Sequence, residues 1–445
     1  MAFWDSFRKP TSAKATATPL DMEPQADSLE ASSLPTAEGL AARNINRRLL
    51  FVGGGASWFE EFEKQFANLQ PTWLCVHVAE VSQPTTDLSP ALFDALVLNA
   101  NLESRAEMIE GSGQKFPRAV RIVLSGEESR PSDSAASNSP ELWFASQQLN
   151  PAALAETIER ALRVQLWLSD PAIRKLLPLL RKLPTVPKLH AQVAQELQSP
   201  DGSLETASQF VRRDPAMAAK FLQVANSALF APAYPLTDPG EAVMFLGSER
   251  SRGIIFAAGV FSQFDAVRCF GFSPEQVWSY SLQVASLARG IALVETEDPK
   301  LAELCFTAGL LHDIGRLVLA ANLPEMYATI SQLQINKGLS LPDAELANLG
   351  TTHGELGGCL LGTWSLPGAL LDAVAWHHCP SRSSDKAFSV LTAVHVAHVL
   401  AQEASSRDRA TPAADHLDRA YLTAVGVGRR LAFWRQACGL PPQAA

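Results

Sequence analysis

Cysteine and positive charge are both scarce in this chain of 445 residues. The six cysteines are scattered and form no Cys-x-x-Cys pair, which predicts reduced thiols of the kind found in the cytoplasm. Lys and Arg together number 37 against 46 Asp and Glu, so the formal net charge is −9. No general basic field therefore draws the chain to nucleic acid.

Long apolar runs are missing as well. No stretch reaches the roughly 18 apolar residues that a membrane span requires. The N-terminal MAFWDSFRKP lacks the basic and then apolar order of a signal peptide. These features predict a cytoplasmic protein without a membrane segment. The chain does have 47% hydrophobic residues, enough for a substantial core, and a length that suits two or three domains.

The texture of the sequence predicts four segments. Residues 1–45 are rich in Ala, Ser, Thr, Pro and Glu, and we expect a disordered leader because they bury too little apolar surface to offset their ordering entropy. Residues 46–166 mix strand and helix patterns. Residues 167–405 have helical patterns alone, and residues 406–445 form a C-terminal helical extension that either packs on the preceding helices or offers a docking helix.

The strand patterns of residues 46–166 are short apolar runs that end in turn residues: RRLLFVGGG, FDALVLNA and AVRIVLSGE. Two further runs have helical spacing, with apolar stripes at Phe59, Phe62, Phe66 and Leu69 and at Leu154, Ile158, Leu162 and Leu166. Strands that alternate with helices favour an α/β fold with a parallel sheet.

Helix-start signals are frequent after residue 167. Asp170 and Asp214 each precede a proline, which is a typical way to cap and begin a helix. Gly247 is expected to end one helix and Ser248 to cap the next. These signals predict an all-α domain, joined to the α/β domain by a helix around residues 150–182.

The first domain resembles the receiver domains of two-component response regulators, which implies a flavodoxin-like α/β fold. Receivers hold magnesium with acidic residues after the first strand, where this chain has Gly53 and Gly54. The position of the phosphate-accepting Asp corresponds to Asn99, and the usual Ser or Thr corresponds to Ser125. Gln147-Gln148 replaces the usual Lys-Pro. Because an amide is no nucleophile for phosphoryl transfer, the resemblance implies a pseudo-receiver that cannot be phosphorylated.

The second domain resembles HDOD domains, a branch of the HD superfamily that is found in bacterial signalling and usually lacks phosphohydrolase activity. The resemblance covers about residues 175–405 and is carried by LPTVPKLHAQVAQEL, by RRDPAMAAKFLQVANSALFAPAYPLTDPGEAVMFLGSERSRGII, by FTAGLLHDIGRLVLA and by HGELGGCLLGTWSLPGALLDAVAWHH. It implies a helical bundle of the HD type.

In HD phosphohydrolases a distant His, a His-Asp pair and a later Asp surround one metal ion. His312 and Asp313 match the pair. The distant His corresponds to Tyr280, a poor ligand because its phenol titrates near ~10. The later Asp corresponds to His398, with His395 one turn before it. Two of the four expected ligands are therefore replaced.

The two-metal branch of the superfamily adds further histidines, and His353, His377 and His378 match their positions. The resemblance thus implies a candidate metal set of His312, Asp313, His353, His377 and His378, suited to one ion of zinc, iron or manganese. The alternative is that these groups are core residues that hydrogen-bond to one another.

Together these features predict a bacterial, cytoplasmic signal-transduction regulator of a two-component type. It would act through contacts with protein partners and not through catalysis, and it would bind neither nucleic acid nor a membrane. The sequence leaves open whether the protein forms a homodimer. The alternatives are a metal-dependent phosphohydrolase, such as a cyclic-dinucleotide phosphodiesterase, and a nucleotide sensor that does not hydrolyse its ligand.

Overall fold

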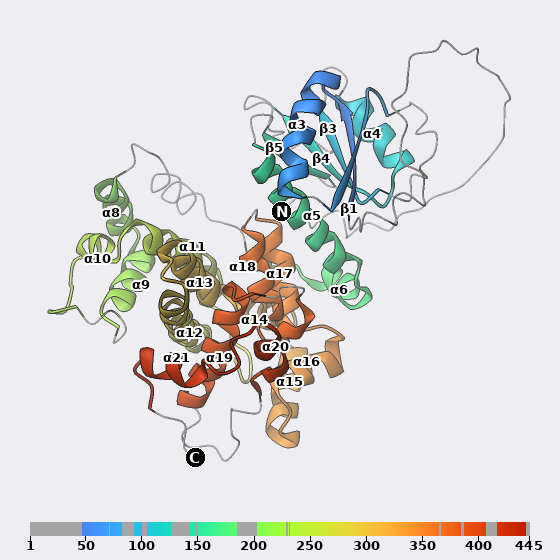
Figure 1. The fold of residues 1–445 in the computed structure, drawn as a ribbon. Coiled ribbons are helices and arrows are strands. Elements are labelled where there is room, and N and C mark those ends of the chain that lie inside the picture. The colour runs from blue at the N-terminus through green and yellow to red at the C-terminus, as the bar shows by residue number, and fades with distance from the viewer. Residues whose placement is uncertain are drawn as a thin grey trace, which may run out of the picture. The chain divides into compact units, whose positions relative to one another are not determined.

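The chain divides into two compact units, residues 1–166 and 167–445 (Figure 1). The computed structural model describes residues 47–70, 72–81, 93–99, 105–125, 142–146, 150–184, 203–227, 230, 232–364, 366–383, 387–405 and 416–441. The predicted leader, residues 1–45, lies outside the described residues.

A five-stranded parallel sheet forms the centre of the first unit. Its strands are β1 (Arg47–Gly53), β2 (Trp73–Val78), β3 (Ala95–Asn99), β4 (Val120–Ser125) and β5 (Leu142–Ser146). They pair in the order β2-β1-β3-β4-β5, and every pair is parallel. This is the strand order of flavodoxin-like sheets, so the expected α/β class with a parallel sheet is confirmed.

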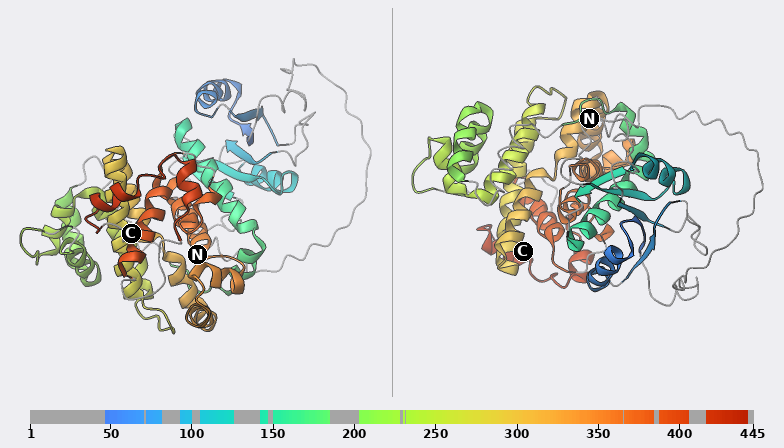
Figure 2. Two further views of the ribbon diagram at one scale, coloured as in Figure 1. Left: turned by 60° about the horizontal axis from the view of Figure 1, so that its bottom comes forward. Right: turned by 90° about the horizontal axis from the view of Figure 1, so that it is seen from above.

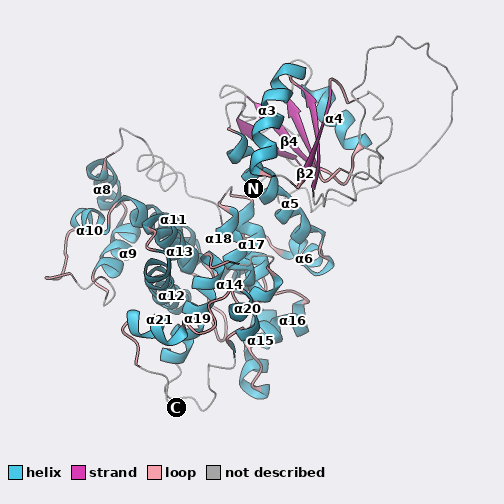
Figure 3. Cartoon of the chain, viewed as in Figure 1, coloured by secondary structure: helices cyan, strands magenta, loops and turns pink. Residues whose placement is uncertain are grey.

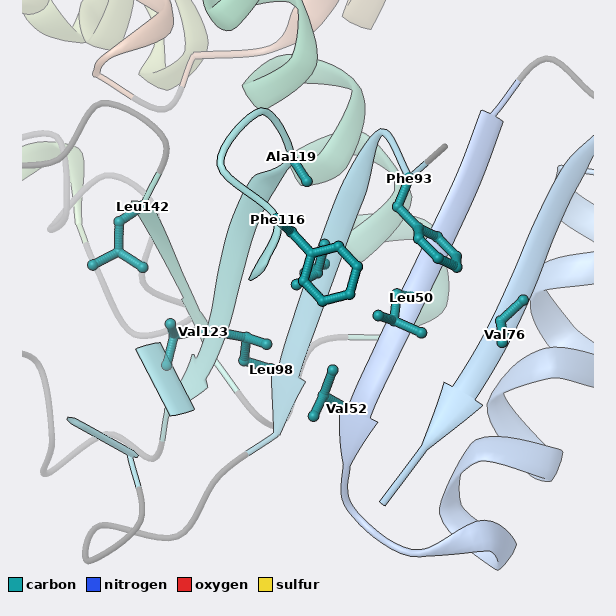
Figure 4. Packing of buried hydrophobic residues seen from close by; sticks show 10 residues of the cluster. Leu50, Val52, Val76, Phe93, Leu98, Phe116, Ala119, Val123 and Leu142 are labelled. Atoms are coloured by element: carbon teal, nitrogen blue, oxygen red, sulfur yellow. The ribbon is translucent and has the colours of Figure 1, made fainter. Parts of the chain in front are cut away.

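Apolar side chains from the strands build the core of this unit (Figure 4). Leu50 and Val52 on β1, with Leu96 and Leu98 on β3, are buried in it. Strand β2 was not among the predicted strands, although its sequence WLCVHV begins with four consecutive apolar residues. It lies at the edge of the sheet, where only Trp73 and Val76 of this strand are buried.

Three helices accompany the sheet: α3 (Ala56–Leu69), α4 (Arg105–Lys115) and α5 (Pro151–Ser169). The stripe predicted for α3 is buried except for its last member, Leu69. In α5 the predicted stripe is wrong beyond Ile158, because Leu166 is 71% exposed while Ala161 is buried. A step of four residues exceeds the 3.6-residue turn, so a strict four-residue series drifts off the buried face.

The second unit is helical, and the strands of the described residues all lie in the first (Figure 3). Its α-helices are α6 (Pro171–Leu176), α8 (Leu204–Arg213), α9 (Pro215–Ala225), α10 (Pro239–Leu246), α11 (Ser248–Phe261), α12 (Pro274–Thr296), α13 (Pro299–Leu311), α14 (Ile314–Asn322), α15 (Pro324–Lys337), α16 (Leu341–Leu349), α17 (His353–Gly362), α18 (Gly368–Trp376), α19 (Val390–Ser405), α20 (Arg419–Ala424) and α21 (Leu431–Ala437).

Helices α12, α13 and α19 pack against one another at the centre of this unit (Figure 2). The segment Pro299–Asn322 is apolar and long enough to cross a membrane, but 78% of its apolar window is buried inside the protein. Such burial is typical of a core helix. The segment is also interrupted between α13 and α14 by His312 and Asp313.

The helix starts follow the predicted capping signals with one exception. The carboxylates of Asp170 and Asp214 accept backbone N–H bonds at the starts of α6 and α9, as predicted. At the junction of α10 and α11, Gly247 both ends the first helix and caps the second, so the cap predicted for Ser248 is wrong. Its positive φ of 81° suits glycine, which pays no steric cost there.

The linking segment is also not a single helix, because α5 ends at Ser169 and α6 begins after Asp170. The described part of the C-terminal extension packs on the bundle. The carboxylate of Glu295 on α12 accepts hydrogen bonds from Arg430 at 2.9 Å and from the Trp434 indole at 2.8 Å.

Candidate metal centre

The His-Asp pair lies at the junction of α13 and α14, close to the start of α17. His312 ends α13 and Asp313 begins α14, so the pair lies at the sharp turn between them. A Cβ at Gly315 would overlap the carbonyl oxygen of His353. Only a glycine at this position therefore allows α14 and α17 to come this near.

His312 and His377 occupy equivalent positions at the ends of α13 and α18. Each ring nitrogen Nδ1 donates to the carbonyl oxygen three residues earlier, Gly309 at 2.7 Å and Val374 at 2.8 Å. Because a carbonyl oxygen only accepts hydrogen bonds, the proton of each neutral ring must be on Nδ1. Burial lowers the pKa of both imidazoles, that of His377 to well below its usual value, and both are therefore neutral with Nε2 as an acceptor.

Tyr280 and His398 lie beside His312, as the resemblance implied. Nδ1 of His398 is 3.4 Å from Nε2 of His312 and 3.3 Å from the Tyr280 hydroxyl. The Tyr280 hydroxyl donates to the backbone oxygen of His398 at 3.1 Å. Burial raises the pKa of Tyr280 above its ordinary value, so the phenol stays protonated and is no anionic ligand.

His353 is held between two carboxylates. Its Nδ1 donates to Glu345 on α16 at 2.7 Å, and its Nε2 lies 3.2 Å from Oδ1 of Asp313. Burial alone would lower the pKa of His353, but Glu345 and Asp313 outweigh it and raise that pKa to about 9. Sequence reasoning missed Glu345 because it lies in LPDAELANL, a segment without a motif, and only the fold brings it to His353.

Asp313 is buried and paired with Arg316 one turn later, at 2.7 Å. Burial alone would raise the pKa of Asp313, but Arg316, His312 and His353 hold it well below its usual range. Asp313 is therefore a carboxylate at neutral pH. Its Oδ1 also lies 3.6 Å from Nε2 of His312.

Two further histidines of the helical unit differ in their position: His378 lies in the cluster, and His395 lies outside it. Nε2 of His378 lies 3.2 Å from Nε2 of His353. His395 uses both its nitrogens elsewhere: Nδ1 donates to the backbone oxygen of His377 at 2.7 Å, and Nε2 accepts from the backbone N–H of Asp418 at 3.0 Å. His395 therefore positions the backbone at His377 and offers no lone pair to the cluster.

The histidines form two groups that could hold a metal ion, His312 with His377 and His398, and His353 with His377 and His378. The donors within each group lie within 4.8 Å of one another. Nε2 of His377, common to both groups, is buried without a hydrogen-bond partner among the described residues. Neutral imidazoles with an unused lone pair suit nitrogen-binding transition metals such as zinc, so the donor set fits a metal ion.

The carboxyl edge of the sheet in the first unit holds the residues that the resemblance to receivers singled out. Gly53 pairs with Asn99 in the register of β1 and β3. A Cβ at Gly54, whose φ is +80°, would lie 2.6 Å from the Asn99 amide nitrogen. Any other side chain at Gly54 would therefore strain the backbone and displace the Asn99 amide. Ser125 ends β4, and Gln147-Gln148 lies outside the described residues.

Comparison with known proteins identifies the helical unit. Residues 183–380 match the model of the HDOD domain. A protein of Treponema pallidum (strain Nichols) whose role is uncharacterised is 25% identical over 201 residues, which are 44% of this chain and 37% of that protein. The chain thus covers little more than a third of this relative's length.

Two solved structures are also similar to this chain, each with a low TM-score. An HDOD domain protein of unknown function from Geobacter sulfurreducens is 26% identical, with 60% of this chain and 88% of that one covered and a TM-score of 0.47. The MmoQ response regulator of Methylococcus capsulatus str. Bath is 26% identical, with 58% and 98% covered and a TM-score of 0.31. The match to the HDOD model covers residues 183–380, less than half of the chain, so this segment of the helical unit is similar to HDOD domains.

Proposed function

We propose that this protein is a bacterial signalling regulator that acts through protein–protein contacts, with a non-catalytic HDOD domain and a receiver-like domain that cannot be phosphorylated. The observation that carries the proposal is the closure of the histidine cluster. His312, His353 and His377 have no exposed surface, and Asp313 has 1%. A phosphohydrolase has to bring a phosphate ester to its metal and water. The cluster reaches the surface only through His378, which is partly exposed, and His398, which is 8% exposed, so it has room for an ion but little for a phosphate ester.

The two replaced positions support the same proposal. Tyr280 stands where the resemblance implies a histidine ligand, and its neutral hydroxyl is engaged with His398. His398 stands where it implies a carboxylate. A metal held there would have one carboxylate nearby, Asp313, where the resemblance implies two, and so less of the negative charge that helps a hydrolytic site to activate water.

The receiver-like part of the proposal rests on the carboxyl edge of the sheet. Asn99 provides an amide at the position of the acceptor, and the crowded glycines beside it provide no carboxylate for magnesium. Such a domain still offers surfaces for a protein partner or for a second copy of the chain. We propose that these contacts, in the cytoplasm, are its output.

Helix α5 spans Pro151–Ser169 and so runs from the first unit into the second, which begins at Trp167. Within the first unit, Arg160 on this helix lies over the ring of Trp143. Within the second unit, Trp167 contacts Trp376, with 6.2 Å between ring centroids, and Trp376 immediately precedes His377. We propose that a partner that shifts this end of α5 acts through the two tryptophans on the helix end that carries two histidines.

A metal-dependent phosphohydrolase is the second candidate, favoured by the two histidine groups that could hold a metal. The test is turnover of a panel of cyclic dinucleotides and phosphomonoesters by the metal-loaded protein, beside Asp313→Asn and Asp313→Ala. We expect the same background rate in all three. A wild-type rate well above both variants would overturn the proposal.

A cellular assay tests the regulatory half. In a deletion strain, Asp313→Asn should restore the phenotype as fully as the wild type, because contact requires no chemistry at Asp313. Failure of a folded Asp313→Asn protein to restore it, together with measurable wild-type turnover, would favour the phosphohydrolase.

A further inference from the structure

Two buried imidazoles present the same ring nitrogen, Nε2, as an acceptor. His312 and His377 each donate through Nδ1 to a carbonyl in the last turn of their own helix, which leaves Nε2 as a lone-pair acceptor. Nε2 of His377 has no hydrogen-bond partner among the described residues. Buried acceptors in folded proteins are nearly always satisfied, so this nitrogen calls for a donor or a cation.

A third imidazole arrives from α19. Nδ1 of His398 is 3.4 Å from Nε2 of His312, and the rings of His377 and His398 are 5.2 Å apart between centroids. Two nitrogens bound tetrahedrally to one zinc ion, with bonds of about 2.0–2.1 Å, are roughly 3.3 Å apart. The spacing of His312 and His398 therefore matches two ligands of one ion.

The other histidine group has less need of a cation. His353 already has a carboxylate at each ring nitrogen, Glu345 at 2.7 Å and Asp313 at 3.2 Å. The second oxygen of Asp313 is taken by Arg316. A metal in this group would have to displace the contact between Asp313 and His353, whereas a metal among His312, His377 and His398 would satisfy an atom that lacks a partner.

We propose that His312, His377 and His398 bind one divalent transition-metal ion through their three imidazoles. This set differs from the one that the resemblance implied, because His398 joins it and Asp313, His353 and His378 stay outside the coordination. Neutral nitrogen donors select a borderline ion such as zinc over magnesium or calcium. The ion would join α13, α18 and α19, and its presence is independent of whether the protein acts by contact or by catalysis.

The test is a cobalt(II) titration of the full-length protein after chelator treatment, followed by visible absorption and by zinc competition. The wild type should bind one equivalent with the intense bands of a low-coordinate nitrogen site. His398→Gln should weaken binding by more than about 100-fold, since the loss of a ligand exceeds the 10–100-fold effect of an outer partner. His378→Gln should leave affinity and spectrum unchanged, as should His416→Gln at an exposed position.

A second measurement covers the case in which His398→Gln does not fold. Zinc added to wild-type protein labelled with ¹⁵N in its nine histidines should shift the ring nitrogens of three residues, assigned as His312, His377 and His398. Loss of binding in His378→Gln or His353→Gln with retention in His398→Gln would overturn the proposal, and so would a wild type that binds neither metal.

Discussion

At the carboxyl edge of the sheet, Gly53, Gly54 and Asn99 stand where the resemblance to receivers implies carboxylates. In the helical unit, His398 stands where the resemblance to HD proteins implies a carboxylate, in a cluster with other histidines and Asp313. The residues at the sheet edge therefore offer neither a carboxylate nor an imidazole to a metal ion. The helical unit differs, because its imidazoles keep lone pairs that could hold one.

The largest effect is expected from the close packing that the helical site requires. Gly315→Ala would place a methyl group into the backbone of His353, and we expect a loss of more than about 4 kcal/mol in the free energy of unfolding. Gly338→Ala is the matched control, because Gly338 has a positive φ but open space around it, and it should cost about 1 kcal/mol. Urea unfolding measures both, and equal losses would refute the packing argument.

A smaller effect is expected from pH. The pKa of His353 is about 9 in the folded metal-free protein and ordinarily 6.5, so folding favours its protonated form. The stabilisation is fully present below pH 6.5 and is lost as the pH rises through 9, on the order of 2 kcal/mol. Thermal unfolding in the presence of a chelator between pH 6.5 and 9.5 measures it. His353→Gln should flatten the profile, and an unchanged slope in that variant would assign the dependence to other groups.

The smallest effect is expected at the sheet edge. Asn99→Asp restores the acceptor carboxylate but neither the acidic magnesium ligands nor the lysine, so it should not accept a phosphoryl group. Its stability should change by no more than about 0.5 kcal/mol. Intact mass after incubation with a small phosphodonor and magnesium tests this. A phosphorylated Asn99→Asp protein would mean that the edge keeps more of its chemistry than its residues suggest.

Much of the fold could be predicted from local patterns. Fully buried strands such as β1 and β3 are continuous apolar runs, and Asp-Pro pairs mark helix starts because capping is a local interaction. Edge strand β2 was missed although it begins with the apolar run WLCV, because a short apolar run does not by itself distinguish a strand from a segment of helix. The buried face of α5 was misplaced because helical periodicity is not a whole number of residues.

The candidate site, like the fold, could be predicted from the sequence only in part. The resemblance placed Tyr280, His312 and His398 together, and the structure agrees. Nothing in the sequence indicated that Glu345 would bind His353 or that His395 would turn away to Asp418, because these contacts depend on how distant helices pack. Local motifs therefore located the candidate site, whereas tertiary contacts decide which of its nitrogens remains available.

The contact of Glu295 with Arg430 and Trp434 spans 135 and 139 residues of sequence. A ribosome that adds about 5–20 residues per second needs on the order of ten seconds to supply those partners after α12 has emerged. During that interval Glu295 on α12 lacks its contacts with Arg430 and Trp434, and His395 lacks its hydrogen bond from Asp418. The helical unit is therefore completed late in translation, and a stalled nascent chain would expose an unfinished bundle to chaperones.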